Sequence, residues 1–403
     1  MVIRTPMSNV STLLAPRQLL VGAGTTFEVG GALRRLRIAP GSALVVVDPN
    51  VLSRGLLDPL LSGLVAAGFD AHVFDGIEGE PDDAIVMVCA DEARLVDATV
   101  VVGIGGGSVM DVAKMVSLLA TNGGGISHWL GIADPQVAPL TLVLIPTTTG
   151  TGSEATRIAM VSVEGAKRAV SCSEFVPTIA VLDPNLVVDL PSHIVASTGM
   201  DALAHAVESI LSTNRNHFTL SAATSAIALL TTHLEDAVAG DSFAREHMLY
   251  GAHLAGMALN AGVVLGHSLA YVVARHSPIS HGASCALALP YCLAYNEGTA
   301  ADVANIISKA VTGEEQSGLQ LVADRIAQLA ANVAQPTSLS AIGIGSADIP
   351  LMAKEVVDEY PRPNNPVGIE FSAIEHLLER MLDGNLSSCW SDRKAGGSES
   401  RDT

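Results

Sequence analysis

Short runs of apolar and β-branched residues alternate with helix-like stretches through the first half of the chain. Four of these runs have the composition of buried strands, at residues 44–48, 71–74, 99–104 and 142–145. The third run is almost entirely apolar, as expected for a strand that is covered on both of its faces. Continuous apolar strands separated by helices predict a parallel sheet with helices on both sides.

The pattern changes near residue 191. From there to about residue 383, Ala- and Leu-rich stretches repeat with a 3.6-residue period, and little strand signal remains. We therefore predict an α/β domain over residues 1–190, an all-α domain over residues 191–383 and a flexible tail over residues 384–403. Two domains also fit the length, since 403 residues exceed what one hydrophobic core usually supports.

Residues 252–274 carry no formal charge and are long enough to span a bilayer. The segment nevertheless contains two histidines, an asparagine, a serine and a tyrosine. Transferring that many polar groups into lipid is costly, so we predict a buried core helix and not a membrane span.

The composition argues against nucleic-acid-binding and secreted proteins. The chain has 41 acidic and 22 basic residues and a formal net charge of −19, so it should repel nucleic acid. Its five cysteines lack the spacing of a disulfide framework, and its N-terminus lacks the apolar core of a signal peptide. We expect a cytoplasmic protein that acts on a small molecule, without a nucleic-acid or membrane partner.

A glycine-rich stretch made of Gly105, Gly106, Gly107 and Ser108 follows the third predicted strand. We expect Ser108 to cap a helix that runs to residue 119, and the N–H groups at such a helix start can bind a pyrophosphate. Ser108 stands where the usual dinucleotide fingerprint has its third glycine. A tight strand-to-helix turn without a ligand is the alternative interpretation.

Two other groups also follow predicted strands. Thr147, Thr148 and Thr151 lie in a loop that can line a nucleotide cleft or simply face solvent. Asp48 ends the first strand, where a carboxylate can bind the adenosine ribose hydroxyls and repel a 2′-phosphate, or can belong to an ordinary Asp-Pro-Asn turn. All these groups should lie at the carboxyl edge of the sheet, where α/β proteins bind ligands.

The second half carries candidate metal ligands. Asp201 and His205 are spaced i, i+4 in an apolar helical stretch, so their side chains share one buried face and can bind one cation. With His267 and His281 they form an N/O donor set that suits Zn²⁺ or Fe²⁺. Only the first pair has a diagnostic spacing, and a buried histidine is more often a satisfied core residue.

These residues lie in motifs by which the chain resembles the iron-containing (group III) alcohol dehydrogenases. The motifs are GGGSVMDVAK at 105–114, PTTTGTGSE at 146–154, the run at 177–184 that ends in LDP, TGMDALAHAVES at 198–209 and LPYCLAYN at 289–296. The resemblance covers about residues 12–383. It implies a Rossmann-like dinucleotide-binding domain, a helical domain, and hydride transfer between NAD(P) and a metal-polarised alcohol or aldehyde.

The resemblance also assigns individual residues. It places the metal, Fe²⁺ or Zn²⁺, on Asp201, His205, His267 and His281. It places the cofactor beside Asp48, Gly105, Gly106, Gly107, Ser108, Thr147, Thr148, Thr151, Lys167 and Leu182. Asp48 matches the position that favours NAD over NADP, and we expect a homodimer or a larger homo-oligomer.

One departure from the family pattern bears on proton transfer. Many members have a histidine one helical turn after the third metal ligand, where this chain has Tyr271. Tyr271 can act as a hydroxyl link in proton transfer or can simply wall the pocket, and His276 is the other candidate proton donor. Arg275 can bind a carboxylate or phosphonate on a short aldehyde, or can be a surface residue at a helix end.

Two other functions remain open. A sugar-phosphate cyclase of the dehydroquinate-synthase type has a similar two-domain architecture, but its phosphate pocket needs several basic residues, and this chain has few near the candidate ligands. A catalytically dead binding scaffold would lack a metal ligand, whereas all four are present. We therefore expect an NAD-dependent alcohol dehydrogenase or aldehyde reductase.

Overall fold

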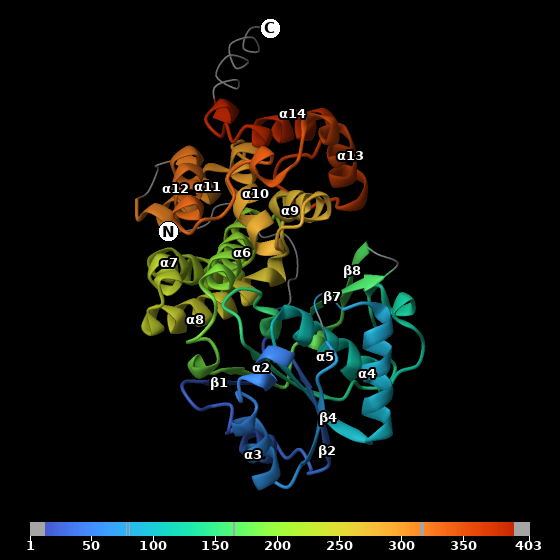
Figure 1. Ribbon diagram of the computed structural model, residues 1–403. Coiled ribbons are helices and arrows are strands. Elements are labelled where there is room, and N and C mark those ends of the chain that lie inside the picture. Colours follow the sequence, from blue (N-terminus) through green and yellow to red (C-terminus); the bar gives the residue numbers. More distant parts are fainter. Residues whose placement is uncertain (1–12, 78, 80, 164–165, 315–317, 391–403) are drawn as a thin grey trace. The chain divides into compact units, whose positions relative to one another are not determined.

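The computed structural model describes residues 13–390 except 78, 80, 164–165 and 315–317. The chain forms two compact units, one over Leu14–Leu190 and the other from Pro191 onward (Figure 1). The first unit combines strands and helices, and the second is helical. This confirms the predicted fold class.

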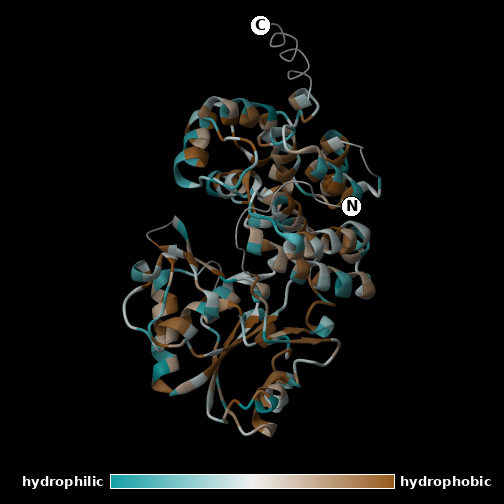
Figure 2. Ribbon diagram, turned by 180° about the vertical axis from the view of Figure 1, so that it is seen from behind, coloured by the Kyte–Doolittle hydropathy of each residue, from teal (hydrophilic) through white to brown (hydrophobic). Residues whose placement is uncertain are grey.

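The first unit is built on a six-stranded sheet in which all pairings are parallel, as the apolar runs predicted. Its strands, in spatial order, are β1 (Gln18–Val21), β9 (Ile179–Leu182), β6 (Thr141–Pro146), β4 (Ala98–Gly105), β2 (Ser42–Val47) and β3 (Asp70–Phe74). Most of these strands are brown in Figure 2, which marks their apolar sequences.

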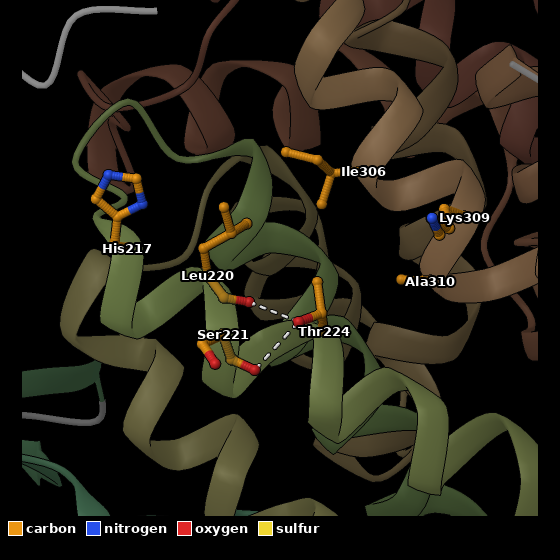
Figure 3. Close-up of a pocket in the computed structure, with 7 residues that line it drawn as sticks. All are labelled: His217, Leu220, Ser221, Thr224, Ile306, Lys309 and Ala310. Atoms are coloured by element: carbon orange, nitrogen blue, oxygen red, sulfur yellow. Dashed lines mark hydrogen bonds between the residues drawn. The ribbon is translucent and has the colours of Figure 1, made fainter. Parts of the chain in front are cut away.

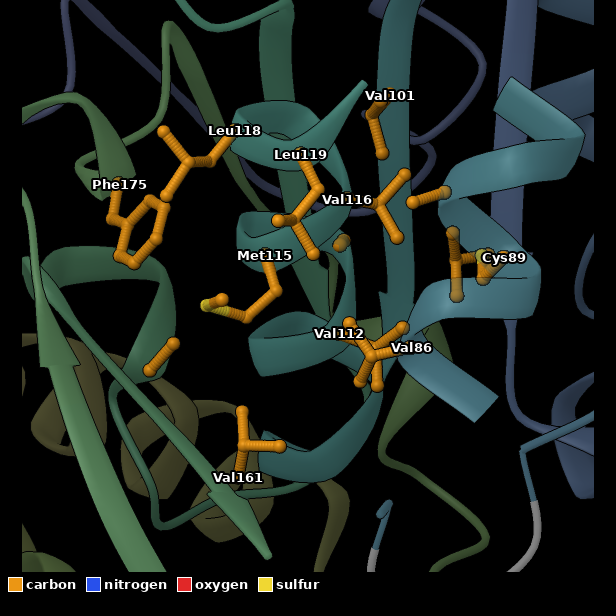
Figure 4. Close-up of a cluster of buried hydrophobic side chains, with 14 of the residues drawn as sticks. Val86, Cys89, Val101, Val112, Met115, Val116, Leu118, Leu119, Val161 and Phe175 are labelled. Carbon is orange, nitrogen blue, oxygen red and sulfur yellow. The ribbon is translucent and has the colours of Figure 1, made fainter. Parts of the chain in front are cut away.

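Both faces of this sheet are covered. Helices α4 (Asp83–Leu95) and α5 (Gly107–Leu119) pack on one face, and α1 (Val29–Arg35) and α3 (Asp58–Ala66) pack on the other. Successive side chains of β4 alternate between the two cores, with Val101 in the first (Figure 4) and Val102 in the second. Burial on both faces explains why this strand carries almost no polar residue.

Two smaller features complete the first unit. Helix α2 (Pro49–Ser53) directly follows β2. A separate three-stranded sheet has the order β5 (Gly131–Ile132), β8 (Ala166–Ser171) and β7 (Ile158–Val163), and β7 pairs antiparallel with β8.

The second unit consists of packed helices. They are α6 (Ser192–Leu211), α7 (His217–Ala239), α8 (Ser242–Ala258), α9 (Leu265–His276), α10 (His281–Tyr295), α11 (Ala301–Thr312), α12 (Gly318–Asn332), α13 (Ile349–Glu359) and α14 (Phe371–Leu382). Helix α6 contacts both α7 and α10, and α10 also contacts α9.

The apolar segment at 252–274 is mostly buried, as predicted, but it is not one helix. Helix α8 ends at Ala258, a 3-10 turn named η5 follows (Leu259–Ala261), and Gly262 takes a φ of 79° before α9 begins. The two helical stretches are bent by 110°. Among the described residues no single helix meets the length and composition test for crossing a membrane, and only this bent pair meets it when taken together.

The segment expected to be a flexible tail is described in part. Residues 384–387 continue from α14 in turns, residues 388–390 are helical, and Trp390 is only 3% exposed. Residues 391–403 lie outside the described residues.

Candidate functional site

Three helices of the second unit carry the candidate metal ligands. Asp201 and His205 lie one turn apart on α6, His267 lies in the first turn of α9, and His281 is the first residue of α10. Asp201, His205 and His267 are all buried. The structure thus brings together four side chains that the sequence spreads over three helices.

Three imidazole nitrogens lie near one carboxylate oxygen. Oδ1 of Asp201 lies 3.6 Å from Nε2 of His205 and 3.6 Å from Nε2 of His267. Nε2 of His281 lies 3.7 Å from the same oxygen. Ligands at about 2.0–2.1 Å from a tetrahedral ion are about 3.4 Å apart, so this spacing fits a single divalent cation.

The electrostatics of Asp201 also fit a cation. Its Oδ1 is buried and accepts no hydrogen bond within the described part of the chain, which is a costly state for a carboxylate. Burial raises the pKa of Asp201, but the imidazoles of His205, His281 and His267 outweigh it and hold this pKa well below its usual value. The carboxylate is therefore ionised and oriented toward the imidazoles.

Cys285 is a member of this cluster that the sequence analysis missed. It lies one turn after His281 on α10 and is buried. Its Sγ is 3.6 Å from Nε2 of His281 and 3.9 Å from Nε2 of His267. The donor atoms of Asp201, His267, His281 and Cys285 all lie within 4.8 Å of one another, and this set does not include His205. The i, i+4 spacing from His281 is the sequence signal that would have found it.

Glu208 is a second residue that the sequence analysis missed. It is completely buried, and its Oε1 accepts a hydrogen bond of 2.6 Å from Nδ1 of His267. Its Oε2 accepts from the backbone N–H groups of Val264 and His267, at 2.8 and 3.2 Å. A proton held on Nδ1 leaves Nε2 of His267 free to bind a metal, which is the usual role of such a carboxylate.

A glycine lets two of the ligand helices approach each other. Gly282 follows His281, and a Cβ built on it would lie 2.1 Å from the backbone oxygen of Ser197 on α6. Any other residue would therefore push α10 away from α6 at the position where His281 and Asp201 meet. The close packing needs glycine at this position.

In the first unit, the candidate cofactor residues follow three adjacent strands. Asp48 follows β2, the glycine-rich stretch follows β4, and the threonine loop follows β6. The Asp48 carboxylate caps α2, because Oδ1 accepts from the backbone N and the side-chain Nδ2 of Asn50, at 2.8 and 2.9 Å. The predicted turn chemistry is therefore present, while Oδ2 accepts no hydrogen bond from any described residue.

The glycine-rich stretch and the threonine loop pack against each other. The backbone N of Thr147 donates to the oxygen of Gly105 at 2.9 Å, and a Cβ on Gly107 would lie 2.9 Å from Cγ2 of Thr151. Oγ1 of Thr148 is buried and has no hydrogen-bond partner among the described residues. These backbone groups and this hydroxyl can bind a phosphate group.

Ser108 does not cap α5, so that expectation is wrong. The helix begins at Gly107, and its N-cap residue is Gly106, which has an extended backbone. Ser108 therefore lies within the first turn. Its N–H is still among the free donors of a helix N-terminus, so an anion can still be bound there.

Lys114 on α5 binds the residues that directly follow the threonine loop. It is fully buried, and Nζ donates to Ser153, Thr156 and the backbone oxygen of Ile158 at 2.6, 3.1 and 2.7 Å. Nζ also lies 3.6 Å from Oδ1 of Asp111. Burial lowers the pKa of Lys114 and raises that of Asp111, while their mutual attraction opposes both shifts.

The remaining cofactor candidates lie elsewhere in the first unit. Leu182 is the buried last residue of β9, beside β6 in the main sheet. Lys167 lies on β8 of the small sheet, where it pairs with Ser162 of β7. The small sheet shares no strand pairing with the main sheet among the described residues.

The candidate proton donors lie on α9. The ring of Tyr271 stacks on that of His281, with centroids 5.1 Å apart and an interplanar angle of 13°. Nε2 of His276 lies 2.8 Å from Oε2 of Glu355. The structure therefore places Tyr271 against the ligand cluster and His276 in a pair with a carboxylate.

Arg275 is engaged by two acidic residues. Its guanidinium bonds Glu359 at 2.8 and 3.1 Å, lies 3.2 Å from Glu355, and donates to the Tyr360 hydroxyl at 2.8 Å. Its charge is already balanced within the protein. The interpretation of Arg275 as a residue at a helix end therefore fits better than a role in binding an anionic substrate.

The second unit also contains a pocket of about 450 Å³ between α7 and α11 (Figure 3). It is lined by His217, Leu220, Ser221, Thr224, Ile306, Lys309 and Ala310. None of the candidate metal ligands lines it, so it is separate from the cluster described above.

Comparison with known proteins identifies the family. The model of the iron-containing alcohol dehydrogenases matches residues 16–184, and that of the C-terminal part of the same family matches residues 195–382. The long-chain-alcohol dehydrogenase 1 of Geobacillus thermodenitrificans is 32% identical over 87% of this chain and 91% of its own. The NAD-dependent methanol dehydrogenase of Bacillus methanolicus is 32% identical over 93% of this chain and 100% of its own.

A solved structure agrees with these sequence matches. The crystal structure of a 1,3-propanediol oxidoreductase has a TM-score of 0.87 and 29% identity, and the match covers 93% of this chain and 100% of that one. The chain therefore belongs to the iron-containing alcohol dehydrogenase family and is an NAD(P)-dependent, metal-containing oxidoreductase.

Proposed function

We propose that this enzyme interconverts a small alcohol and its aldehyde with NAD, using one divalent cation held by Asp201, His205, His267 and His281. The observation that carries the proposal is the set of three Nε2 atoms at 3.6, 3.6 and 3.7 Å from Oδ1 of Asp201. Four N/O donors without an obligatory thiolate suit Fe²⁺ or Zn²⁺.

Residues of the chain orient the metal ligands and bind the cofactor. A bound divalent ion acts as a Lewis acid toward the substrate oxygen, and NAD carries the hydride. Glu208 holds the proton on Nδ1 of His267, so that Nε2 faces the metal position. The backbone donors at Gly106, Gly107 and Ser108 bind the pyrophosphate.

Two further residues contact the cofactor and border the metal site. The free Oδ2 of Asp48 accepts hydrogen bonds from the adenosine ribose and disfavours a 2′-phosphate, so NAD is preferred. The ring of Tyr271 walls the site on the side of His281. Solvent then supplies the proton that completes aldehyde reduction.

The relatives named above are alcohol dehydrogenases and an oxidoreductase, which favours this function over a sugar-phosphate cyclase. The two reactions also differ in a simple readout, because a cyclase regenerates its NAD in each cycle and releases phosphate, whereas an aldehyde reductase consumes NADH. Net oxidation of NADH by aldehyde, without phosphate release, therefore distinguishes the two.

The test starts from metal-free protein prepared with a chelator. We expect no aldehyde-dependent oxidation of NADH until Fe²⁺ or Zn²⁺ is added back, and one bound metal per chain by elemental analysis. The variants Asp201→Asn and His281→Ala should lose both the metal and the activity. Full activity in the metal-free protein would refute the proposal.

A further inference from the structure

The segment between α13 and α14 carries an arginine in a stiff stretch of backbone. Arg362 stands between Pro361 and Pro363. A proline fixes its own φ and restricts the residue before it to extended conformations, so the backbone at Arg362 has little freedom. Its side chain therefore starts from a defined position.

This segment is also pinned to the helices of the metal cluster. The oxygen of Tyr360 accepts a hydrogen bond of 2.6 Å from Ser268, the neighbour of His267. Nδ2 of Asn364 donates to the oxygen of Val263 at 2.9 Å. Anchors on both sides of Arg362 hold it at a fixed place relative to α9.

The side chain of Arg362 lies over the ring that walls the cluster. Its Cζ is 5.8 Å from the centroid of Tyr271, whose other contacts include the stacked ring of His281. Arg362, Tyr271 and His281 thus form a continuous series of contacts that ends at the candidate metal position.

Arg362 has no partner for its charge among the described residues. Its Nε is buried without a hydrogen bond, and no described carboxylate lies within 4.0 Å of its guanidinium. Arg275, on the neighbouring helix, is held by Glu355 and Glu359.

The carboxylates of the cluster are already engaged. Asp201 faces the three imidazoles, and Glu208 is bound to His267 and to two backbone N–H groups, so neither pairs with Arg362. An anionic group on the substrate would supply the missing partner, and a guanidinium binds carboxylate, phosphonate and sulfonate groups through paired hydrogen bonds.

We propose that Arg362 binds the anionic end of the substrate, and that the natural substrate is a short aldehyde or alcohol carrying a carboxylate, phosphonate or sulfonate group. This inference rests on the proposed aldehyde reductase activity. It assigns anion binding to Arg362 and not to Arg275, because the N–H groups of Arg275 are bonded within the protein, whereas Nε of Arg362 has no hydrogen-bond partner among the described residues.

The test compares matched substrates on the metal-loaded enzyme. Propionaldehyde serves as the uncharged aldehyde, and succinic semialdehyde, phosphonoacetaldehyde and sulfoacetaldehyde serve as the charged ones. We expect wild-type kcat/KM to be highest for one of the charged aldehydes. Arg362→Met should lower that value by about 100-fold or more and leave propionaldehyde within about threefold, since a lost charge-assisted pair penalises only the charged substrate.

Two further variants and a binding measurement sharpen the test. Arg362→Lys keeps the charge and loses the planar fork, so it should fall between wild type and Arg362→Met. Arg275→Gln should show no selective loss for charged aldehydes. Calorimetry with sulfoacetate and phosphonoacetate should detect binding to wild type and not to Arg362→Met.

The possible failures are distinguishable. If no aldehyde is reduced at all, the proposed function fails. If propionaldehyde is reduced as well as the charged aldehydes, or if Arg362→Met slows both kinds equally, the reductase activity stands and the role of Arg362 is refuted.

Discussion

Nδ1 of His267 lies 2.6 Å from Oε1 of Glu208, and both side chains are almost completely buried. The same carboxylate accepts two backbone N–H groups at the start of α9. One buried side chain therefore fixes both the ring of a candidate metal ligand and the helix that carries it.

We predict that Glu208→Gln weakens metal binding by about 10- to 100-fold, the usual cost of losing such a partner. Glutamine has one acceptor oxygen, so its NH₂ group must face either Nδ1 or the two N–H donors. Competition with a chromogenic chelator measures the affinity. Glu379→Gln, at an exposed position of α14, is the control, and equal affinities in the two variants would contradict the prediction.

We expect Cys285 to contact a metal bound at the cluster. Its Sγ lies 3.6 and 3.9 Å from two Nε2 atoms, close enough for the thiol to be a further donor beside Asp201 and the histidines. Cobalt-substituted wild type should therefore show a sulfur-to-cobalt charge-transfer band in the near ultraviolet. Cys285→Ala should lose this band and bind Zn²⁺ less tightly relative to Mn²⁺.

Cys292→Ala is the matched control, because Cys292 is equally buried on the same helix and its Sγ contacts Asn296. The cobalt spectrum of this variant should equal that of wild type. A band that persists in Cys285→Ala would show that the thiol stays off the metal.

Lys114→Met should destabilise the first unit by about 3–5 kcal/mol, because it leaves the charge of Asp111 buried without its partner. The threonine loop should also loosen, because Ser153 and Thr156 lose their donor. Urea unfolding measures the stability, and calorimetric titration with NAD measures the weakened binding.

The double variant Lys114→Met/Asp111→Leu removes both charges and separates the two effects. It should recover much of the stability while NAD binding stays weak, because the loop contacts remain missing. Recovery of both properties would mean that Lys114 acts only through its charge.

Asp48→Ser should relax the preference for NAD. Removing the carboxylate removes its repulsion of the 2′-phosphate, and we expect kcat/KM with NADP to rise by about tenfold relative to NAD. Steady-state kinetics with both cofactors provide the measurement. An unchanged ratio would mean that Asp48 serves only as the cap of α2.

Tyr271→Phe should change kcat by no more than about threefold. The ring stacks on His281, while the hydroxyl makes no hydrogen bond to any described residue, so packing is its main role. A fall of about 100-fold, with a shifted pH profile, would instead identify the hydroxyl as a proton relay. Tyr271→Leu removes the ring and should impair both activity and metal affinity.

Much of the fold could be predicted because its signals are local. Apolar runs predicted the strands β2, β3, β4 and β6, and the parallel sheet followed from their largely apolar sequences, whereas the strands β1 and β9 of the same sheet were not predicted. Two details depended on tertiary structure. Gly106 took the cap position expected of Ser108, and Gly262 divided a segment whose composition suits one helix.

The candidate site could also be predicted from the sequence only in part. The i, i+4 pair of Asp201 and His205 has a diagnostic spacing in the sequence, whereas His267 and His281 were candidates without one, and the family resemblance supported them. The sequence analysis considered Arg275 as an anion-binding residue and did not consider Arg362. Which of them meets a carboxylate depends on how α13 lies against α9, and no local pattern encodes that.

The bend at Gly262 lets one residue set the direction in which α9 leaves the preceding turn. Its φ of 79° is a conformation that glycine adopts readily and other residues rarely adopt. The bend separates α8 from the helix that carries His267, whose Nε2 lies 3.6 Å from Asp201 on α6. An ion held by both residues should therefore stabilise this bent form by mass action, and metal-loaded protein should resist proteolysis longer than metal-free protein.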